Sequence, residues 1–387
     1  MLIVAAGCAH VPERSPLPEE RLADAGVLSI PRARFWGDAP PPWTHEWMER
    51  SAREMRDRYS GVYGREHAYL AISGGGRNGA FAAGLLLGWT AAGDRPEFST
   101  VTGISAGGLV APFAFLGPEY DHVLKEVSTE LTADDVFEER RILRGLRMDA
   151  MASTEPLQRL IEKYVDQEMI ERIAEEYRKG RMLNIGTTDL DAMRPVVWRV
   201  GAIANSGHPR ALELIRQIML ASASIPGAFP PVLIEVEAGE ERYDELHVDG
   251  GVTSQVFLYP AGLDWGEVLE KLHVPDRPRV YVIRNSRLDP PYEQVDIRLF
   301  PIVGRSVASL IRTQGIGDLY RIYLQTCRDG LEFNLASIPR DFNETPREEF
   351  DPVYMRNLFD TAFALAKAGY PWQKTPPELG AEAVVCR

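Results

Sequence analysis

Cysteine, paired histidines and long hydrophobic runs are what this 387-residue sequence has least of. Its three cysteines, Cys8, Cys327 and Cys386, are too few for a disulfide scaffold and lack the spacing of a metal site. The seven histidines form no HxH or HxxxH pair, so the sequence predicts no dedicated metal site. The longest apolar run, Ala80–Trp89, is far shorter than the roughly 20 residues that cross a bilayer, which argues against a membrane span.

The sequence also lacks an excess of basic residues. It has 43 lysines and arginines against 56 acidic residues, a net charge of −13 and a pI of about 5.2. A protein held on nucleic acid by counterion release needs the opposite balance, so this class of partner is not expected. An acidic protein can still act on lipid. With 45% hydrophobic and 26% charged residues, the composition is that of a globular protein and excludes the disordered and fibrous classes.

The first eight residues end in Ala-Gly-Cys after an apolar stretch. They resemble the last part of a bacterial lipoprotein signal, in which the cysteine is lipidated after cleavage, although no basic residues precede them. Cys8 is therefore a lipidation candidate, and the expected location is the cell envelope, with the cytoplasm as the alternative. Outside the cytoplasm, Cys327 and Cys386 could form a disulfide; two unpaired thiols are the alternative.

Proline is concentrated near the start of the chain. Seven prolines lie between His10 and Trp43, a composition typical of an extended tether. A charged segment at Glu46–Tyr59 is compatible with a helix, and periodic patterns begin after it.

Strand-like and helix-like patterns alternate through most of the remaining chain. A buried strand is predicted at His67–Ser73 and a helix from about Gly79 to Ala92; a second strand, Phe98–Thr102, precedes a helix at Gly108–Leu116. This alternation predicts a three-layer α/β/α fold with a mostly parallel central sheet. Further strands are predicted at Met182–Thr188, Val196–Ala204, Val232–Val236, Leu246–Val248, Val280–Arg284 and Leu331–Leu335, and further helices at Asp121–Leu131, Pro156–Val165, Met169–Lys179, Arg210–Leu220, Val303–Gln325 and Tyr354–Ala368.

A GxSxG motif runs from Gly103 to Gly107, with Ser105 at its centre. It lies between a predicted strand and a predicted helix, the setting of a nucleophile elbow, where the sharp turn needs small residues on both sides of the serine. Ser105 is therefore the candidate nucleophile. The alternative is a glycine-lined turn whose serine caps the following helix.

A second glycine-rich loop, Ser73–Gly79, also joins a predicted strand to a predicted helix. Successive backbone N–H groups in such a loop can converge on an anion near the positive end of the helix dipole. The loop also fits the GxGxxG dinucleotide fingerprint, but the acidic residue that this site needs does not end the next strand. An oxyanion hole for Ser105 accounts for both loops together.

The third motif, Asp249-Gly250-Gly251, follows the predicted strand Leu246–Val248. An aspartate at this place can be a general base or a turn residue, because Asx-Gly turns are common. Taken together, the serine motif, the glycine loop and the Asp-Gly-Gly motif resemble the patatin-like phospholipase family, over roughly Ala68 to Val252.

The resemblance implies a role for each motif. Ser105 would be the nucleophile, Asp249 its proton acceptor in a Ser–Asp dyad without histidine, and Gly74, Gly75 and Gly76 the oxyanion hole. The motif-supporting residues would be Arg77, Asn78, Gly79, Gly103, Gly107, Gly250 and Gly251. The implied enzyme is a serine acyl hydrolase, a lipid esterase or phospholipase A-like enzyme. Its substrate would be a lipid or ester, a membrane surface is a possible partner, and no metal or organic cofactor is needed.

The sequence departs from the family in its glycine loop. The arginine that usually precedes the last glycine is replaced by Asn78, and Arg77 stands one position earlier. Asn78 is therefore expected to cap the following helix.

Three apolar segments have a structural and a functional interpretation. The segment Ala221–Pro231 resembles a family segment that precedes the late strands, and we expect a structural role, with lining of an acyl pocket as the alternative. The runs Ala80–Leu87 and Val110–Leu116 are expected to pack in the core, with an acyl-binding wall as the alternative.

The sequence predicts three regions: residues 1–45 as a leader and proline-rich tether, residues 46–290 as the catalytic domain, and residues 291–387 as a helical extension packed on it.

Two other functions compete with the acyl hydrolase. A conventional Ser-His-Asp esterase of the α/β-hydrolase type needs a histidine after the acid, and only His273 follows Asp249. His247 shares a strand face with Asp249 and could reach the same cleft. The other rival is a non-catalytic lipoprotein binding module.

Overall fold

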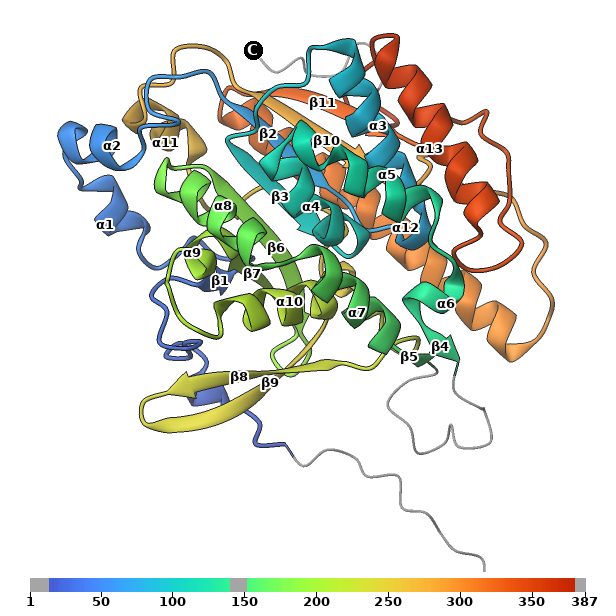
Figure 1. The fold of residues 1–387 in the computed structure, drawn as a ribbon, viewed down its shortest axis with the longest axis horizontal. Helices are drawn as coiled ribbons and strands as arrows, with labels where there is room; N and C mark the ends of the chain where they lie inside the picture. Colours follow the sequence, from blue (N-terminus) through green and yellow to red (C-terminus); the bar gives the residue numbers. More distant parts are fainter. Residues whose placement is uncertain (1–13, 140–151, 380–387) are drawn as a thin grey trace, which may run out of the picture.

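The structure, a computed structural model, describes residues 14–139 and 152–379 (Figure 1). Its centre is a sheet in which neighbouring strands follow the order β1-β7-β6-β3-β2-β10-β11. Five strands of this sheet are parallel: β2 (Ala68–Ile72), β3 (Thr100–Ile104), β6 (Met182–Asp189), β10 (Arg279–Arg284) and β11 (Glu332–Ser337). The predicted mostly parallel α/β fold is confirmed.

The central strands bury side chains on both faces of the sheet. In β2, Leu70 and Ile72 belong to one hydrophobic core, whereas Tyr69 and Ala71 belong to the other. Because successive side chains of a strand point to opposite faces, a strand that is apolar throughout needs helices on both sides. The sheet is therefore the middle of three layers.

Each face of the sheet has its own set of helices (Figure 1). One core is formed with α3 (Gly79–Ala92), α4 (Ala106–Leu116), α5 (Asp121–Thr129), α7 (Glu155–Tyr164), α8 (Gln167–Arg178), α9 (Val200–Ala204), α10 (Ala211–Ser222) and α13 (Pro352–Lys367). The other core is formed with α1 (Thr44–Met48), α2 (Ala52–Arg58), α11 (Trp265–Lys271) and the second half of α12 (Leu299–Arg328). The short elements α6 (Ala133–Val136), β4 (Glu138–Glu139) and β5 (Ala152–Ser153) lie between α5 and α7 in the chain.

Two antiparallel additions complete the sheet. Strand β7 (Arg194–Arg199) pairs with β6 on the side away from β3. The hairpin of β8 (Val232–Ala238) and β9 (Glu241–Asp249) joins through the last three residues of β9, which pair with the end of β6. Figure 1 shows the rest of this hairpin projecting from the body of the protein.

The predicted proline-rich tether is wrong for residues 14–45, which pack on the domain. Strand β1 (Arg34–Trp36) pairs antiparallel with β7. Val27, Ile30 and Ala33 are buried in the core, which offsets the entropy of ordering this arm. The prolines favour an extended chain, and an extended chain can still pair with the edge of a sheet, as β1 does with β7.

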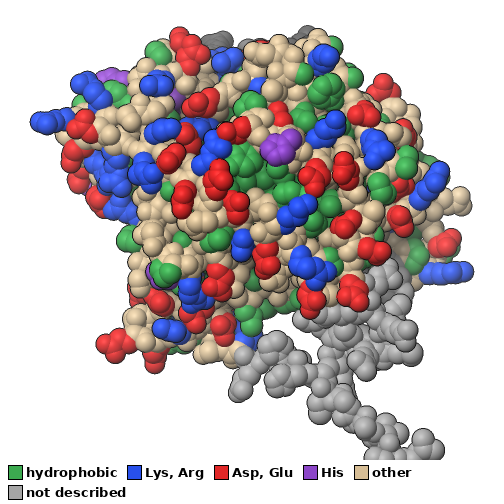
Figure 2. Space-filling model, viewed as in Figure 1, with side chains coloured by type: hydrophobic (Ala, Val, Ile, Leu, Met, Phe, Trp, Pro, Cys, Tyr) green, Lys and Arg blue, Asp and Glu red, His purple; other side chains and the backbone are tan. Residues whose placement is uncertain are grey.

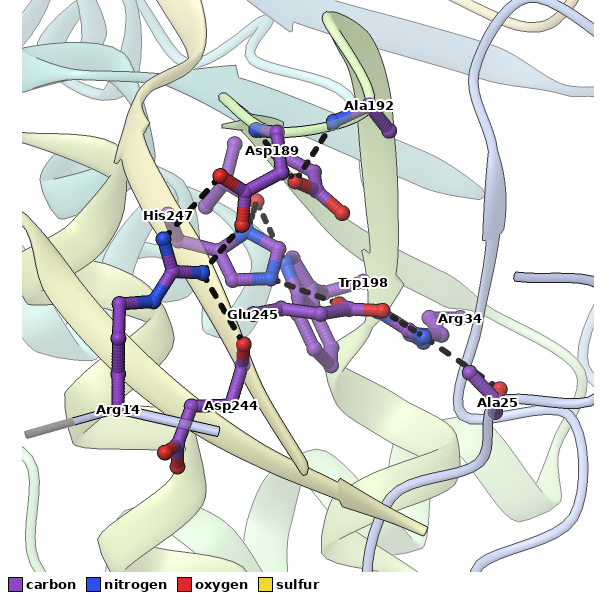
Figure 3. A network of polar contacts seen from close by, with 11 residues as sticks. Arg14, Ala25, Arg34, Asp189, Ala192, Trp198, Asp244, Glu245 and His247 are labelled. Carbon is purple, nitrogen blue, oxygen red and sulfur yellow. Dashed lines mark hydrogen bonds and ion pairs between the residues drawn. The ribbon is translucent and has the colours of Figure 1, made fainter. Parts of the chain in front are cut away.

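A buried polar network fixes this N-terminal arm to β9 (Figure 3). The guanidinium of Arg34 donates to both carboxylate oxygens of Glu245, one at 2.7 Å, and a ring nitrogen of His247 lies 3.0 Å from the same carboxylate. The other ring nitrogen of His247 lies 3.0 Å from the hydroxyl of Thr187. Burial raises the pKa of Glu245, but Arg34 and His247 outweigh it and hold the pKa at about 2, so this carboxylate stays charged.

Other differences from the predicted elements are local. The predicted strand Val196–Ala204 ends at Arg199, and the chain continues as α9, which buries Val200 and Ile203 at helical spacing. Residues after 290 contribute β11 to the sheet as well as helices. Cys8 and Cys386 lie outside the described residues, so the pairing of Cys327 with Cys386 stays open.

The surface carries charged side chains of both signs. On the face shown in Figure 2, acidic and basic side chains are interspersed. Among the described residues, no helix combines the length and the apolar character required to span a membrane.

Candidate active site

Three loops meet at the ends of neighbouring strands. The loops after β2 and β3 lie at the same edge of the sheet because these strands are parallel neighbours. Ile104, the last residue of β3, pairs with Gly186 of β6, and the next residue of β6, Thr187, pairs with Asp249 of β9. Strand β9 thus occupies the place beside β6 that β3 leaves. This register brings Asp249 next to Ser105.

Ser105 occupies a strained turn between β3 and α4. Its φ of +55° and ψ of −128° are rare for a residue with a side chain. The glycines of the motif make the turn possible: a Cβ on Gly103 would lie 2.3 Å from the carbonyl oxygen of Gly107, and one on Gly107 would lie 2.3 Å from that of Ile72. This is the strand–turn–helix geometry of a nucleophile elbow.

The side chains of Ser105 and Asp249 line one cavity, and the Ser105 hydroxyl acts on the carboxylate as a hydrogen-bond donor that lowers its pKa. The N–H of Gly251 donates to the same carboxylate at 2.7 Å. Asp249 is buried and has no cationic partner among the described residues. Burial raises the pKa of Asp249 to about 6, even though the hydrogen bonds from Ser105 and Gly251 favour the ionised form. The site therefore pairs a hydroxyl with a carboxylate of increased basicity.

The glycine loop leaves two backbone donors free. The N–H of Gly74 donates to the carbonyl of Gln255 at 3.2 Å, whereas those of Gly75 and Gly76 have no acceptor within the described part of the chain. Gly75 has a φ of +159°, and a Cβ there would lie 2.6 Å from the carbonyl oxygen of Asn285. A side chain at this position would displace the loop. Gly74 itself faces Ser105, since its Cβ would lie 3.1 Å from that of Ser105.

Asn285, at the end of β10, holds the glycine loop in place. Its side-chain amide donates to the carbonyl of Ser73 at 2.8 Å, and its N–H donates to the Ser73 hydroxyl at 2.9 Å. Its side-chain oxygen accepts from the N–H of Ala82 in α3 at 3.1 Å. Sequence reasoning missed this residue, because nothing but its place after a predicted strand marks it.

The end of α10 and the segment after it hold Ser105 and Asp249 in place. The N–H of Ser105 donates to the hydroxyl of Ser222 at 2.9 Å, and this hydroxyl donates to the carbonyl of Gly186 at 2.7 Å. The N–H of Asp249 donates to the carbonyl of Ser224 at 2.9 Å. The predicted segment Ala221–Pro231 therefore positions Ser105 and Asp249, and sequence reasoning singled out the segment but not these two serines.

The remaining positions of the glycine loop make structural contacts. Arg77 forms an ion pair with Glu349. Asn78 stands at the N-cap of α3, but its side chain makes no capping hydrogen bond and instead accepts one from the hydroxyl of Tyr354 at 2.9 Å. The predicted capping role of Asn78 is therefore wrong, because α13 supplies a donor that the sequence around the loop does not reveal. Gly79 begins α3, and a Cβ on Gly250 would lie 2.6 Å from the carbonyl oxygen of Gly186.

A cavity of about 1850 Å³ contains Ser105, Asp249 and the glycine loop. Its walls are largely apolar and come from α4, α5, α7, α10 and the segment before β8, including Phe113, Leu131, Leu157, Ile161, Met219 and Phe229. Both interpretations of the apolar segments hold in part. Ala80, Val110 and Phe113 reach the cavity while their neighbours pack in the core, and Ile225, Pro226, Ala228 and Phe229 line it.

No histidine of the described residues lines this cavity. His247 is fully buried in the network with Glu245 and Thr187, on the side of β9 that packs against Trp198. His273 lies against Tyr63, with ring centroids 5.2 Å apart. Over the same described residues, no group of three metal-ligating side chains comes together.

Comparisons with known proteins find a match over the segment that carries Ser105 and Asp249. Residues 70–261 match the family model described as patatin-like phospholipase. No curated protein matches. VipD from Legionella pneumophila is a solved structure with 13% sequence identity and a TM-score of 0.37, over 78% of this chain and 67% of that one.

The raised pKa of Asp249 makes a prediction about stability. Folding favours the protonated form of Asp249. The free energy of unfolding therefore falls as the pH rises from about 4 to about 6, and it stays at the lower value above pH 6. The shift from 3.8 to about 6 corresponds to about 3 kcal/mol at neutral pH. Asp249→Asn removes the charge, so we expect a higher free energy of unfolding than wild type at pH 8 and a difference that shrinks toward pH 4.

Urea unfolding of both proteins between pH 4 and pH 8 measures this. Asp57→Asn, at an exposed position of α2, is the control and should show no such pH-dependent gain. A stability difference for Asp249→Asn that is the same at every pH would contradict the buried-charge assignment.

Proposed function

We propose that the protein is a serine acyl hydrolase, a lipid esterase or phospholipase A-like enzyme, with Ser105 and Asp249 as its catalytic dyad. The observation that carries the proposal is that Ser105, in its strained turn, and the buried carboxylate of Asp249 line one apolar cavity, in a segment that matches the patatin-like phospholipase model. The strained turn at Ser105 supports the nucleophile role.

The proposed reaction is a two-step acyl transfer. Asp249 accepts the proton of the Ser105 hydroxyl as the oxygen attacks the ester carbonyl carbon, and the same proton then passes to the leaving alkoxide. Water, activated by Asp249, hydrolyses the acyl-enzyme and restores Ser105. A carboxylate with a pKa of about 6 accepts a proton more readily than one at 3.8 and is still ionised at neutral pH.

The free N–H groups of Gly75 and Gly76 are the proposed donors to the oxyanion. They lie at the start of α3, where the helix dipole favours negative charge. Gly74, whose N–H is already used, would contribute by allowing close approach to Ser105. The reaction as proposed uses no cofactor.

The rival functions are less well supported by the geometry. A Ser-His-Asp esterase needs an imidazole beside the serine, and the position is held by Asp249. A non-catalytic binding module has no need for a strained serine bonded to a buried, unpaired carboxylate, both of which cost free energy.

We expect Ser105→Ala and Asp249→Asn each to abolish ester hydrolysis, since either change removes the nucleophile or its base. His247→Gln should retain most of the activity, because His247 contacts Glu245 rather than Ser105. It should lower the melting temperature, since that buried contact is lost. The kcat/KM of the wild type should fall as the pH drops below about 6, where Asp249 becomes protonated.

Hydrolysis of a soluble p-nitrophenyl ester and labelling by a fluorophosphonate probe measure these effects. A loss of about 10³ in kcat for His247→Gln with a mild effect of Asp249→Asn would contradict the dyad. Absence of labelling at Ser105 in the folded wild type would favour the binding module.

The size and mouth of the cavity support a long-chain lipid substrate. Small-molecule pockets hold about 300–1,000 Å³, and this cavity is about 1850 Å³. Around its mouth, large apolar side chains are both exposed to solvent and part of the cavity wall: Leu190, Ile225, Val252, Val307, Leu310 and Ile311.

Half of this apolar rim comes from the first part of α12. There, Leu299, Val303, Val307 and Leu310 recur at helical spacing and are exposed, while Arg305 turns back to Glu293. We propose that the rim rests on a lipid surface, since the same side chains would contact the bilayer and lead into the cavity of Ser105.

Leu310→Glu tests the rim. We expect the affinity for phosphatidylcholine vesicles to fall by roughly tenfold or more, because the change removes a Leu side chain from lipid contact and adds a charge. Hydrolysis of a soluble short-chain ester should stay near wild type. Leu324→Glu is the matched control on the same helix, exposed but outside the cavity wall. Equal losses in both variants, measured by vesicle sedimentation, would contradict a localised lipid contact.

Anchoring at the cell envelope is a proposal from the sequence around Cys8, which lies outside the described residues. If Cys8 carries a lipid, expression from the full reading frame should place the protein in the membrane fraction, and Cys8→Ser should release it. Equal solubility of the two forms, with no lipid on Cys8 by mass spectrometry, would exclude this proposal and leave the cytoplasm as the location.

A further inference from the structure

Five arginines of the described residues line the cavity that contains Ser105, and they fall into two groups. Arg77, Arg287 and Arg305 form ion pairs with Glu349, Asp289 and Glu293. Arg284 and Arg312 have no carboxylate within 4.0 Å among the described residues. Two cations without an ion-pair partner among the described residues therefore face the same cavity, with Asp318 as a more distant negative charge near Arg284.

Arg284 is buried between the sheet and α12. It is 4% exposed, and its Nε donates to the hydroxyl of Ser286 at 2.7 Å while one terminal nitrogen donates to the carbonyl of Arg312 at 3.4 Å. A guanidinium has five N–H donors, so most of its hydrogen-bonding capacity remains unused. Gly315 of α12 makes room for it, since a Cβ there would lie 2.7 Å from a guanidinium nitrogen.

Arg312 is half-buried beside Arg284. One of its terminal nitrogens donates to the carbonyl of Leu288 at 2.6 Å, but its buried Nε has no hydrogen-bond partner among the described residues. Burial, together with the charge of Arg312, lowers the pKa of Arg284 to about 10, and the charge of Asp318 offsets only part of this effect. Two like charges that are partly removed from water cost free energy unless an anion neutralises them.

The pair is connected to the proposed catalytic loop. Arg284 ends β10, the neighbour of β2, and the next residue, Asn285, holds Ser73 at the start of the glycine loop. An anion on the two guanidinium groups would therefore occupy the cavity in which Ser105 meets an ester. A phosphodiester is the anion that a phospholipid carries close to its acyl esters, and guanidinium groups suit it because of their planar donors.

We propose that Arg284 and Arg312 bind the phosphodiester of a phospholipid head group and so make the enzyme prefer phospholipids to neutral glycerides. This inference rests on the proposed hydrolase function and assigns its substrate class. The apolar walls hold an acyl chain, Ser105 meets the ester, and the arginine pair selects the charged head group.

The test compares two soluble substrates that differ in the head group, dihexanoyl-phosphatidylcholine and dihexanoylglycerol, both below the concentration at which they aggregate. Arg312→Gln should lower kcat/KM for the phospholipid by about 10- to 100-fold, the range for a lost hydrogen bond to a charged group. It should change kcat/KM for the glyceride by no more than about threefold. Arg321→Gln is the matched control, since Arg321 lies on the same helix but outside the cavity wall and is paired with Asp318. Both of its kcat/KM values should stay near wild type.

Arg284→Lys and Arg284→Gln are compared in the same two assays, and the melting temperature is measured for each. Arg284→Lys keeps the charge and should retain part of the preference that Arg284→Gln loses. Should Arg284→Gln fail to fold, Arg312→Gln still decides the matter. Equal losses on both substrates in Arg312→Gln, or losses on neither, would overturn the proposal.

Inorganic phosphate separates a head-group site from a site for a free anion. Inhibition of dihexanoylglycerol hydrolysis by phosphate, weakened in Arg312→Gln, together with a wild-type preference for the phospholipid, supports the proposal. Inhibition by phosphate without that preference would overturn it. Failure of the hydrolase proposal is recognised separately, because hydrolysis of both substrates would then be unchanged in Ser105→Ala.

Discussion

The antiparallel pairing of β9 with the end of β6 is the constraint on which the rest of the site depends. Strand β3 leaves the sheet at Ile104, and β9 takes its place beside β6 from Thr187 onward. Only this register carries Asp249 to the hydroxyl of Ser105. A slip of one residue would turn the carboxylate to the opposite face of the strand, so the geometry tolerates no error in the pairing.

The polar network on β9 accounts for how this register is held. Glu245 and His247 precede Asp249 at spacings of four and two, so all three share one face of the strand. Arg34 bonds to Glu245, and Thr187 bonds to His247, so a shifted strand would leave a buried carboxylate without its cation. The N-terminal arm that contributes Arg34 is thus linked to the proposed active site through the strand that carries Asp249.

The local features of the site could be predicted from the sequence, whereas the contacts between distant segments could not. The strand–glycine–helix patterns around Ser73–Gly79 and Ser105 are short-range, because turn geometry and side-chain periodicity are encoded by adjacent residues. Ser222, Asn285 and Arg34 act through hydrogen bonds to segments far away in the chain, and nothing beside them in the sequence indicates the partner. The same reason explains the error at Asn78, whose partner Tyr354 comes from α13. For residues 14–45 the prediction of a tether is wrong, because proline content describes chain stiffness but not whether the chain can pair with a sheet edge.

Buried charges are distributed unevenly in this fold, and the distribution points to the cavity. Away from the cavity, buried arginines have carboxylate partners, as in the pairs Arg34–Glu245, Arg95–Asp121 and Arg181–Glu176. At the cavity, Asp249 and Arg284 are buried with hydrogen bonds to neutral groups alone among the described residues. Burying a charge without an ion-pair partner costs free energy, so these two groups stand out as candidates for contact with a ligand under the proposed function. The two uncompensated groups have opposite signs and separate tasks. A base beside Ser105 suits an ester that must be attacked, and cations elsewhere in the same cavity suit a substrate that carries its own negative charge.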